Sequence, residues 1–470
     1  MQGKPKIGII FITSGWFRDV GLQSPSSSLT NEVDNIAKEI VKRLSKFLVP
    51  VYRGVLYSED EARHAAEEIK NENVDGIIIA PLMWCEDQIL RAALKQLPRL
   101  PSLLCLFLPS KYLPDFVEYQ QMLKGSGLVA ILQLSGFLKR EGYLYKTVTG
   151  YYEDTDIYDE IREHCLAFKI LSSMKNVKCG VLPFRCNQMS TTYIDEFTVR
   201  KLYGIELHYL ELQRFQKEAQ KVSKDDIDKF KKILKSEGHV VEVDQRNLTE
   251  GIRYAIAMEK ILTDEGISIL AMNDIIEEMH DCFGLRPCLT SPGLSSAGIV
   301  VTMEADIAAG IAMYVLSKFT AKSPFYAELY TADLENNAFL MGHPGYHDNI
   351  HHDEDYPVKI VPDVEYKNSD PFTGACSFFK YMPGPVTVVN SVYNGERLRW
   401  TVFEGHSLPG PPKLEGSSHI FCKIEKPIKE FCTSVVQVGV SQHWIVVPGH
   451  IMKNLENLCT WLNIEYIAVE

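Results

Sequence analysis

Four side chains in the last third of the chain have the chemistry of a divalent-cation site. They are Glu304, Glu328, His343 and His443. Two carboxylates and two imidazoles make a hard site of oxygen and nitrogen ligands, which suits a cation such as Mn²⁺. Because the set contains no thiolate and leaves room for substrate oxygens, it favours Lewis-acid chemistry over structural zinc. A cation held by such groups can polarise a carbonyl and assist proton transfer at the neighbouring carbon.

Each of the four residues also has an ordinary structural interpretation. Glu304 follows a predicted strand and opens a predicted helix that runs to about residue 319, where an acid complements the helix dipole. Glu328 lies in an alternating strand and could face solvent. His343 lies in a Gly-His-Pro-Gly turn, and His443 stands at the start of a strand, where a histidine is often structural.

Other polar residues lie close to these four in the sequence. Asp306 could support the site from behind or be an ordinary acid at a helix N-terminus. His347, His351 and His352 could compete with His343 as ligands. The loop at 347–355 that carries them is polar, and we expect it to be exposed.

Length and composition limit the class of protein. A chain of 470 residues predicts roughly three domains of about 150 residues each. The net charge of −12 argues against nucleic acid and anionic membrane surfaces as partners. No apolar stretch approaches the roughly 20 residues that span a bilayer. The N-terminal segment does not resemble a signal peptide, and the 11 cysteines form no CxxC pair, so we expect reduced cysteines and a cytoplasmic location.

Apolar periodicity predicts alternating strands and helices in the first two thirds of the chain. Such an alternation indicates parallel sheets with helices on both faces. A capping box from Ser58 to Glu61 marks one helix start. Predicted strands are 6–13, 48–54, 75–81, 102–108, 177–183, 205–212, 267–272 and 298–302, and predicted helices are 30–47, 156–174, 223–237 and 249–265.

From about residue 321 the pattern changes to short strands. Asn394 and Gly395 predict a type I′ hairpin between 387–393 and 397–403. A single last helix at 452–462 precedes a strand at 465–469. The predicted fold is therefore α/β: two consecutive Rossmann- or flavodoxin-like parallel-sheet domains, then a C-terminal antiparallel β-barrel-like domain. The predicted domain bounds are 1–172, 173–322 and 323–470.

Several segments, in chain order, resemble one enzyme superfamily. Residues 11–15 stand where that family has a strand ending in Thr-Gly-Ser, and 147–154 resemble its junction into the second domain. Residues 286–289 with 303–306 resemble its Pro-Cys and Cys-Glu-x-Asp segments, and 439–443 resemble its Gly-Gly-x-His ligand segment. By these segments the chain resembles the L-arabinose isomerase and L-fucose isomerase superfamily over nearly its full length, and is nearer to the arabinose isomerase branch.

The resemblance implies aldose–ketose isomerisation on Mn²⁺, Co²⁺ or another divalent cation, with Glu304, Glu328, His343 and His443 as its ligands. The cation would polarise the sugar carbonyl and stabilise an enediolate. Either Glu304 or Glu328 would act as the base. The resemblance also implies a homo-oligomer, a trimer or hexamer, whose pockets are completed by a neighbouring subunit's N-terminal domain.

The residues expected to contact substrate depart from the arabinose isomerases. Trp16 stands where those enzymes have Gln, and the stretch from Leu134 to Phe137 replaces a Gln-Ser-x-His stretch. Met189 follows a strand end where related pockets have contacts. We therefore expect Trp16, Phe137 and Met189 to contact a deoxy or otherwise modified sugar, since apolar groups cannot hold hydroxyls. The alternative functions are a non-catalytic sugar-binding or sensor protein, and a sugar epimerase on the same metal scaffold.

Overall fold

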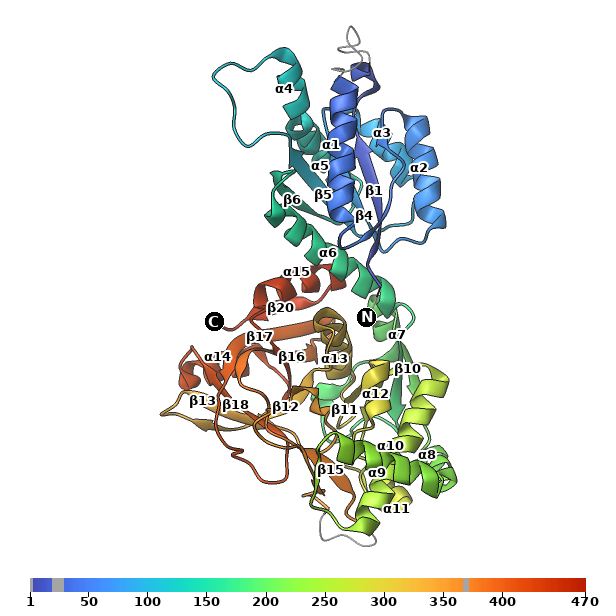
Figure 1. Ribbon diagram of the computed structural model, residues 1–470, viewed down its shortest axis with the longest axis vertical. Coiled ribbons are helices and arrows are strands. Elements are labelled where there is room, and N and C mark those ends of the chain that lie inside the picture. Colours follow the sequence, from blue (N-terminus) through green and yellow to red (C-terminus); the bar gives the residue numbers. More distant parts are fainter. Residues whose placement is uncertain (1–2, 19–28, 367–371) are drawn as a thin grey trace. The chain divides into compact units, whose positions relative to one another are not determined.

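The computed structural model describes residues 3–18, 29–366 and 372–470 (Figure 1). It divides the chain into two compact units, Met1–Ser172 and Ser173–Glu470. The further division at residue 322 stays a prediction. No helix among the described residues is long and apolar enough to cross a membrane. The cysteines are all free, and each one except Cys282 and Cys432 is buried.

The first unit is built on one parallel sheet. Its strands are β1 (Lys6–Ile12), β2 (Val49–Val51), β3 (Val55–Leu56), β4 (Gly76–Pro81), β5 (Ser102–Leu108) and β6 (Tyr145–Tyr151). Among the described residues these strands pair in the order β2-β1-β4-β5-β6, and β3 pairs with β1 beyond the end of β2. Strand β4 is buried throughout, because helices cover both faces of such a sheet.

Helices surround this sheet (Figure 1). They are α1 (Leu29–Leu44), α2 (Glu59–Asn71), α3 (Asp87–Leu94), α4 (Tyr119–Gly125), α5 (Gly127–Arg140) and α6 (Thr155–Met174). The predicted cap of α2 is confirmed, since the Ser58 side chain accepts a hydrogen bond from the backbone of Glu61.

The second unit contains a second parallel sheet, of order β11-β10-β7-β8 in the described residues. Its strands are β7 (Lys178–Leu182), β8 (Glu206–Tyr209), β10 (Ile267–Met272) and β11 (Val300–Thr302). The helices of this region are α7 (Glu196–Tyr203), α8 (Leu212–Lys221), α9 (Lys224–Ser236), α10 (Gln245–Glu265), α11 (Glu277–Phe283), α12 (Pro292–Ala297) and α13 (Ile307–Thr320).

A mainly antiparallel sheet occupies the rest of the second unit. It consists of β12 (Phe325–Asp333), β13 (Ala338–Gly342), β16 (Gly384–Tyr393), β17 (Leu398–Ser407), β18 (His419–Ile424), β19 (His443–Pro448) and β20 (Glu465–Ala468). The order is β16-β19-β12-β13-β18-β17-β20, and β16 also pairs with β17, so the described strands close into a ring. The sheet is mixed, because β20 runs parallel to β17. The α/β class, with parallel sheets and a separate mainly antiparallel sheet, is confirmed.

Shorter elements complete this unit. Helix α14 and the loop of the β16–β17 hairpin differ from what the sequence predicted. A small sheet joins β15 (Ala375–Phe378), β14 (Lys359–Pro362) and β9 (Val240–Val241). Two helices, α14 (Ile428–Val438) and α15 (Met452–Leu462), follow. Only α15 was predicted.

The hairpin between β16 and β17 has a four-residue loop instead of the predicted type I′ turn. Within this loop only Gly395 has a positive φ angle, whereas a type I′ turn needs two such residues. The Asn394 side chain accepts hydrogen bonds from the backbone of Glu396 and Arg397.

The prediction that the loop at 347–355 is exposed holds for Ile350, Glu354 and Asp355 and is wrong for the rest of the loop. Its residues His347, His351 and Asp353 are buried. Each has a polar partner that offsets the loss of water on burial. His347 and His351 contact the backbone oxygens of His343 and Ser323, respectively, and Asp353 pairs with the buried Lys380.

Candidate metal centre

The register of three neighbouring strands brings three of the predicted ligands together. Glu328 on β12 lies opposite His443 on β19 and opposite Gly342 on β13. His343 is the next residue after Gly342. Directly opposite residues of paired strands have Cβ atoms about 5 Å apart on the same face of the sheet. Strand pairing alone therefore places the Glu328 and His443 side chains next to each other.

Glu304 reaches the same place from the parallel sheet. It follows β11 in a tight turn where Glu304 and Ala305 have φ angles of 57° and 52°. Residues with a Cβ atom rarely adopt this left-handed conformation. The prediction that a helix begins at Glu304 is wrong: α13 begins at Ile307, and the Asp306 side chain caps it by accepting from the backbone N–H of Ala309 at 2.8 Å.

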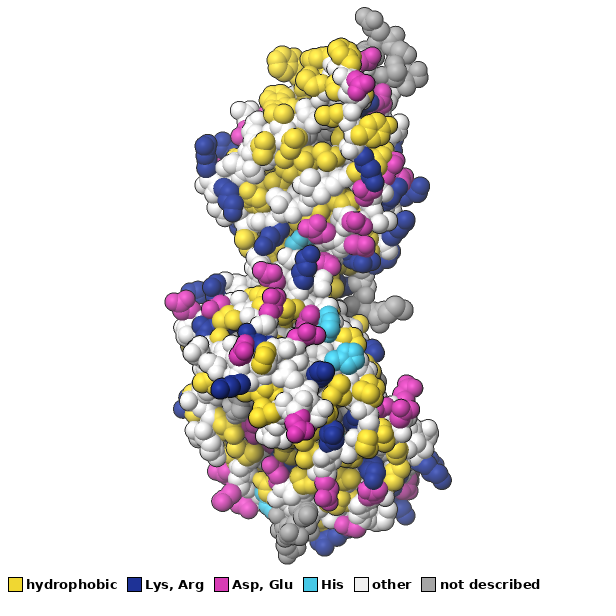
Figure 2. Space-filling view, turned by 90° about the vertical axis from the view of Figure 1, so that its left-hand side faces the viewer, with side chains coloured by type: hydrophobic (Ala, Val, Ile, Leu, Met, Phe, Trp, Pro, Cys, Tyr) yellow, Lys and Arg dark blue, Asp and Glu magenta, His cyan; other side chains and the backbone are white. Residues whose placement is uncertain are grey.

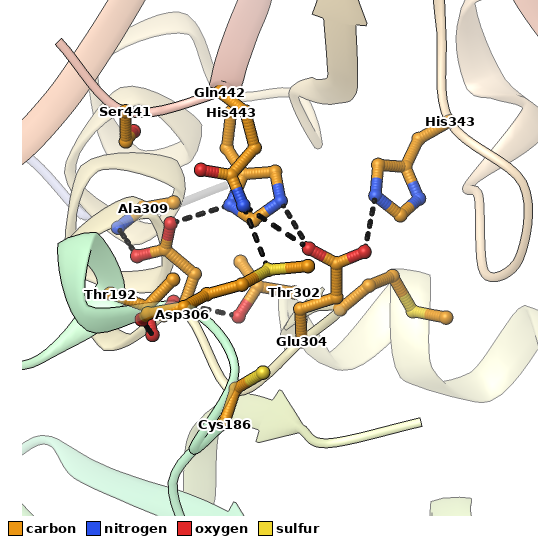
Figure 3. Close-up of polar contacts among 12 residues, drawn as sticks. Cys186, Thr192, Thr302, Glu304, Asp306, Ala309, His343, Ser441, Gln442 and His443 are labelled. Atoms are coloured by element: carbon orange, nitrogen blue, oxygen red, sulfur yellow. Dashed lines mark hydrogen bonds and ion pairs between the residues drawn. The ribbon is translucent and has the colours of Figure 1, made fainter. Parts of the chain in front are cut away.

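The four predicted ligands form one cluster. One side-chain donor atom from each of them lies within 4.8 Å of those of the other three. Glu304 lies between the two imidazoles (Figure 3), with Oε2 at 2.8 Å from Nε2 of His443 and Oε1 at 3.7 Å from Nε2 of His343. Glu304, His343 and His443 are buried, and Glu328 is partly exposed.

Hydrogen bonds on the far side of each imidazole set its tautomer. Nδ1 of His343 is 2.7 Å from the carbonyl oxygen of Pro344, which can only accept. Nδ1 of His443 is 2.7 Å from Oδ2 of Asp306. In a neutral ring Nδ1 therefore carries the hydrogen, and the lone pair of Nε2 points at Glu304. Of the two interpretations given for Asp306, support of the site and an acid at a helix N-terminus, the structure agrees with both.

A lone pair that faces a carboxylate oxygen needs a proton or a cation between them. Burial acts to lower the pKa of His443, but hydrogen bonds to Asp306 and Glu304 outweigh it and raise the pKa to about 10. The chain alone would therefore keep a proton there. Nε2 of His343 is buried and has no hydrogen-bond partner among the described residues.

These residues fit a divalent cation. Bonds of about 2.1 Å to oxygen and nitrogen place opposite ligand atoms at most about 4.2 Å apart, and the four ligand atoms here all lie within 4.8 Å of one another. Two carboxylates balance the charge of such a cation, and the unpartnered Nε2 of His343 gains a partner. The donor set matches the kind of site expected for Mn²⁺.

A second group of potential ligands, Cys288, Asp363 and Cys376, fits a cation less well. Both oxygens of Asp363 already accept from Arg286, each at 2.7 Å. Burial raises the pKa of the Cys288 thiol well above its ordinary value, which disfavours the thiolate that binds metal. This group has a structural explanation in its contacts with Arg286.

The three residues predicted to contact substrate lie in different units. Met189 reaches the centre through Gln442, whose Nε2 is 2.8 Å from the Met189 sulfur and 3.5 Å from Oε2 of Glu304 (Figure 3). Trp16 and Phe137 belong to the first unit. Trp16 is 79% exposed, and Phe137 packs against the core of that unit. Within one unit, therefore, the structure brings only Met189 to the four ligands.

The sequence interpretation missed three residues that contact the centre or its supports. Gln442 could have been noticed because it immediately precedes His443. Asp274 follows the carboxyl end of β10, the edge of a parallel sheet where functional groups usually gather. Arg286 carries no local signal, because its role arises from contacts with Asp274 and Asp363, 12 and 77 residues away.

Three curated proteins named sulfoquinovose isomerase are similar to this chain. Those of Priestia aryabhattai and Priestia megaterium are each 20% identical over 346 residues, which cover 70% of this chain and 73% of the relative. That of Alkalicoccus urumqiensis is 22% identical over 222 residues, which cover 46% of this chain and 48% of the relative. This similarity confirms the prediction that the chain is a sugar isomerase.

Other comparisons add little. No family model matches the chain. A solved structure described as a two-component response regulator/ggdef domain protein aligns with 68% of this chain and 99% of its own, at 10% identity and a TM-score of 0.21. A likeness at that level supports no argument about fold or activity.

Proposed function

We propose that the chain interconverts an aldose and its ketose, with a divalent cation such as Mn²⁺ or Co²⁺ held by Glu304, Glu328, His343 and His443. The convergence of these four side chains within 4.8 Å is the observation that supports the proposal. We also propose that the chain belongs to the L-arabinose and L-fucose isomerase superfamily, in which the same residue types, in the same chain order, are expected to bind the metal.

The proposed chemistry divides between the cation and the protein. When bound, the cation supplies Lewis-acid polarisation of the sugar carbonyl, which acidifies the neighbouring C–H. The protein must then move a proton between C2 and C1 and hold the site in shape. Asp306 and the carbonyl of Pro344 engage Nδ1 of His443 and of His343, so that Nε2 of each ring faces Glu304.

We assign the proton transfer to Glu328. No hydrogen bond or ion pair engages its carboxylate in the described part of the chain, and the side chain is partly exposed. Both oxygens of Glu304, in contrast, face imidazole nitrogens. A carboxylate that is free to approach the substrate suits the base, whereas one fixed between two histidines suits a ligand.

Sulfoquinovose is the first sugar to test. The similar curated proteins carry its name, and it is a glucose derivative in which a sulfonate replaces the hydroxyl at C6. Such a sugar agrees with the expectation of a modified substrate that came from Trp16 and Phe137. A homo-oligomer, trimer or hexamer, and a cytoplasmic location are also part of the proposal.

A panel of aldoses tests the proposal directly. The purified protein is stripped with chelator, reloaded with Mn²⁺ and incubated with sulfoquinovose, L-arabinose, L-fucose and glucose, and products are identified by chromatography. We expect ketose from sulfoquinovose, no turnover in chelator and recovery on adding Mn²⁺. Binding without turnover would favour the sugar-binding or sensor alternative, and an aldose epimeric at C2 would favour the epimerase.

A further inference from the structure

Asp274 contacts the backbone of a proposed metal ligand. It follows β10, is 1% exposed, and its Oδ1 accepts the backbone N–H of Glu304 at 2.8 Å. Its Oδ2 accepts from Nη1 of Arg286 at 3.0 Å. One carboxylate thus joins the ligand's main chain to a buried guanidinium.

The backbone of Glu304 needs such support. Two consecutive residues, Glu304 and Ala305, adopt the left-handed conformation, which is strained for any residue that has a Cβ atom. Both are tied to the end of β10, since the N–H of Ala305 donates to the carbonyl of Met272 at 2.9 Å. Strain of this kind persists only where surrounding bonds hold it, and it gathers at functional sites.

Arg286 in turn fixes Asp274. Its side chain is 1% exposed, and its Nε and Nη2 each lie 2.7 Å from an oxygen of Asp363. A planar guanidinium held in this two-pronged way has little freedom to rotate. Its remaining nitrogen, Nη1, faces Asp274 and Glu365, so the orientation of Asp274 follows from that of Arg286.

We propose that Asp274 is a positioning residue that holds Glu304 in its metal-binding orientation, with Arg286 as its anchor; this inference rests on the proposed function. Glu304 contacts both imidazoles only while its main chain stays in the strained turn. Without the acceptor on Asp274, the turn loses one of the bonds that hold it, and Glu304 spends less time between His343 and His443.

Mn²⁺ titration of the metal-free protein by calorimetry provides the test. We expect Asp274→Ala to weaken Mn²⁺ binding by roughly 10- to 100-fold, the usual effect of losing a group that supports a metal ligand. Asp274→Asn keeps an oxygen that can accept from Glu304 and should recover much of that loss. Asp274→Leu, whose side chain branches at Cγ as that of aspartate does and lacks an acceptor, carries the same expectation as alanine should Asp274→Ala fail to fold.

Asp353→Asn is the matched control. Asp353 is also buried and pairs with Lys380 at 2.6 Å, and no described hydrogen bond or ion pair joins either side chain to the four ligands. We expect this variant to unfold at a lower temperature and to bind Mn²⁺ as the native protein does. A merely structural role for Asp274 predicts the same result for Asp274→Ala, so native-like Mn²⁺ affinity in the folded alanine or leucine variant would overturn the inference.

The native protein and Glu304→Gln separate this inference from the proposed function. If Glu304→Gln abolishes Mn²⁺ binding but the Asp274 variants keep native affinity, the positioning role is refuted and the proposed metal centre stands. Native protein that binds no Mn²⁺ would overturn both.

Discussion

Two glutamates of the candidate centre differ in how firmly the fold holds them. Glu304 is caught between two imidazoles and has its own N–H bonded to Asp274. Glu328 is positioned by strand register alone, and its carboxylate is unpaired among the described residues. Substitution of the two should therefore have different consequences.

We expect Glu304→Gln to lose both Mn²⁺ and turnover, because it removes a charged ligand from the middle of the cluster. Glu328→Gln should keep part of its Mn²⁺ affinity and lose turnover by about 10²- to 10⁴-fold, the usual contribution of a general base. Metal content by mass spectrometry and initial rates measure the two effects. Near-native rates in both variants would remove these residues from the chemistry.

His351 is a buried histidine outside the centre, and its protonation should affect stability. It is 1% exposed, and its Nε2 lies 2.9 Å from the carbonyl of Ser323. Burial, together with the nearby Lys322, lowers its pKa to about 4. A histidine in an unfolded chain has a pKa near 6.5. Between about pH 4 and 6.5, therefore, this histidine binds a proton in the unfolded state and not in the folded state.

The contribution of neutral His351 to the free energy of unfolding should accordingly be complete above about pH 6.5 and lost as the pH falls towards 4. One such proton gives a slope of at most about 1.4 kcal/mol per pH unit in the free energy of unfolding. Urea unfolding between pH 5 and 7.5 should show a shallower pH dependence for His351→Gln than for the native protein. Parallel curves for the two proteins would contradict the assignment.

Helix α13 carries an avoidable backbone cost at its end. Ala321, the residue after the helix, is exposed and has a φ of 57°. Glycine adopts this left-handed conformation without strain and is the preferred residue at that position. The helix α12, in contrast, ends with glycine: Gly298 has a φ of 68° after Ala297.

Ala321→Gly should therefore raise the free energy of unfolding by roughly 0.5–1 kcal/mol. The matched control is Ala297→Gly, at an exposed helical position, where glycine should cost up to about 1 kcal/mol. Chemical denaturation measures both. A loss of stability in Ala321→Gly equal to that of the control would show that residue 321 does not adopt the left-handed conformation.

Local pattern was sufficient for many elements. Strand β10 and helix α15 lie at the predicted residues, because each carries a continuous apolar signal that its tertiary setting does not override. The predicted strand at 48–54 breaks into β2 and β3 around Gly54, whose φ is 119°. The predicted strand at 205–212 ends at Tyr209, and helix α8 begins at Leu212.

Prediction failed where a residue's partners are distant in the sequence. His351 looks polar and exposed in isolation, and its burial depends on a backbone partner, the carbonyl of Ser323, that lies 28 residues away. The turn at Glu304 resembles a helix start, because its strained conformation depends on bonds to Met272 and Asp274. The four proposed ligands could be chosen from residue types and chain order, and Asp306 could be named as a possible support, whereas Asp274 and Arg286 were missed.

The first unit has an exposed apolar surface that bears on the predicted oligomer. Hydrophobic side chains spread over a face of this unit (Figure 2). On α4, α5 and the loop before them, Tyr119 and Leu132 are 67% and 68% exposed, and Leu113 and Phe116 are 81% and 80% exposed. The sequence from Gly125 to Leu138 contains no charged residue. Apolar surface of this kind typically marks an interaction site.

We expect this surface to form the contact between copies of the chain, as the oligomer prediction requires. Leu132→Glu should then shift the protein to a smaller species in light scattering coupled to size-exclusion chromatography. Val436→Glu is a suitable control, because Val436 is 76% exposed on α14 in the other unit. A native protein that elutes as a monomer, or a Leu132→Glu variant of unchanged size, would refute the expectation.

The proposed ligands Glu304 and His443 are 139 residues apart in the chain. During synthesis, a chain that has emerged only as far as β18 lacks the histidine opposite Glu328 and has no strand to close the ring. A ribosome-bound chain therefore cannot complete the proposed metal site until β19 has left the exit tunnel. Binding of a cation at the proposed site should therefore follow the emergence of β19, and chains truncated before His443 should bind Mn²⁺ more weakly than the native protein.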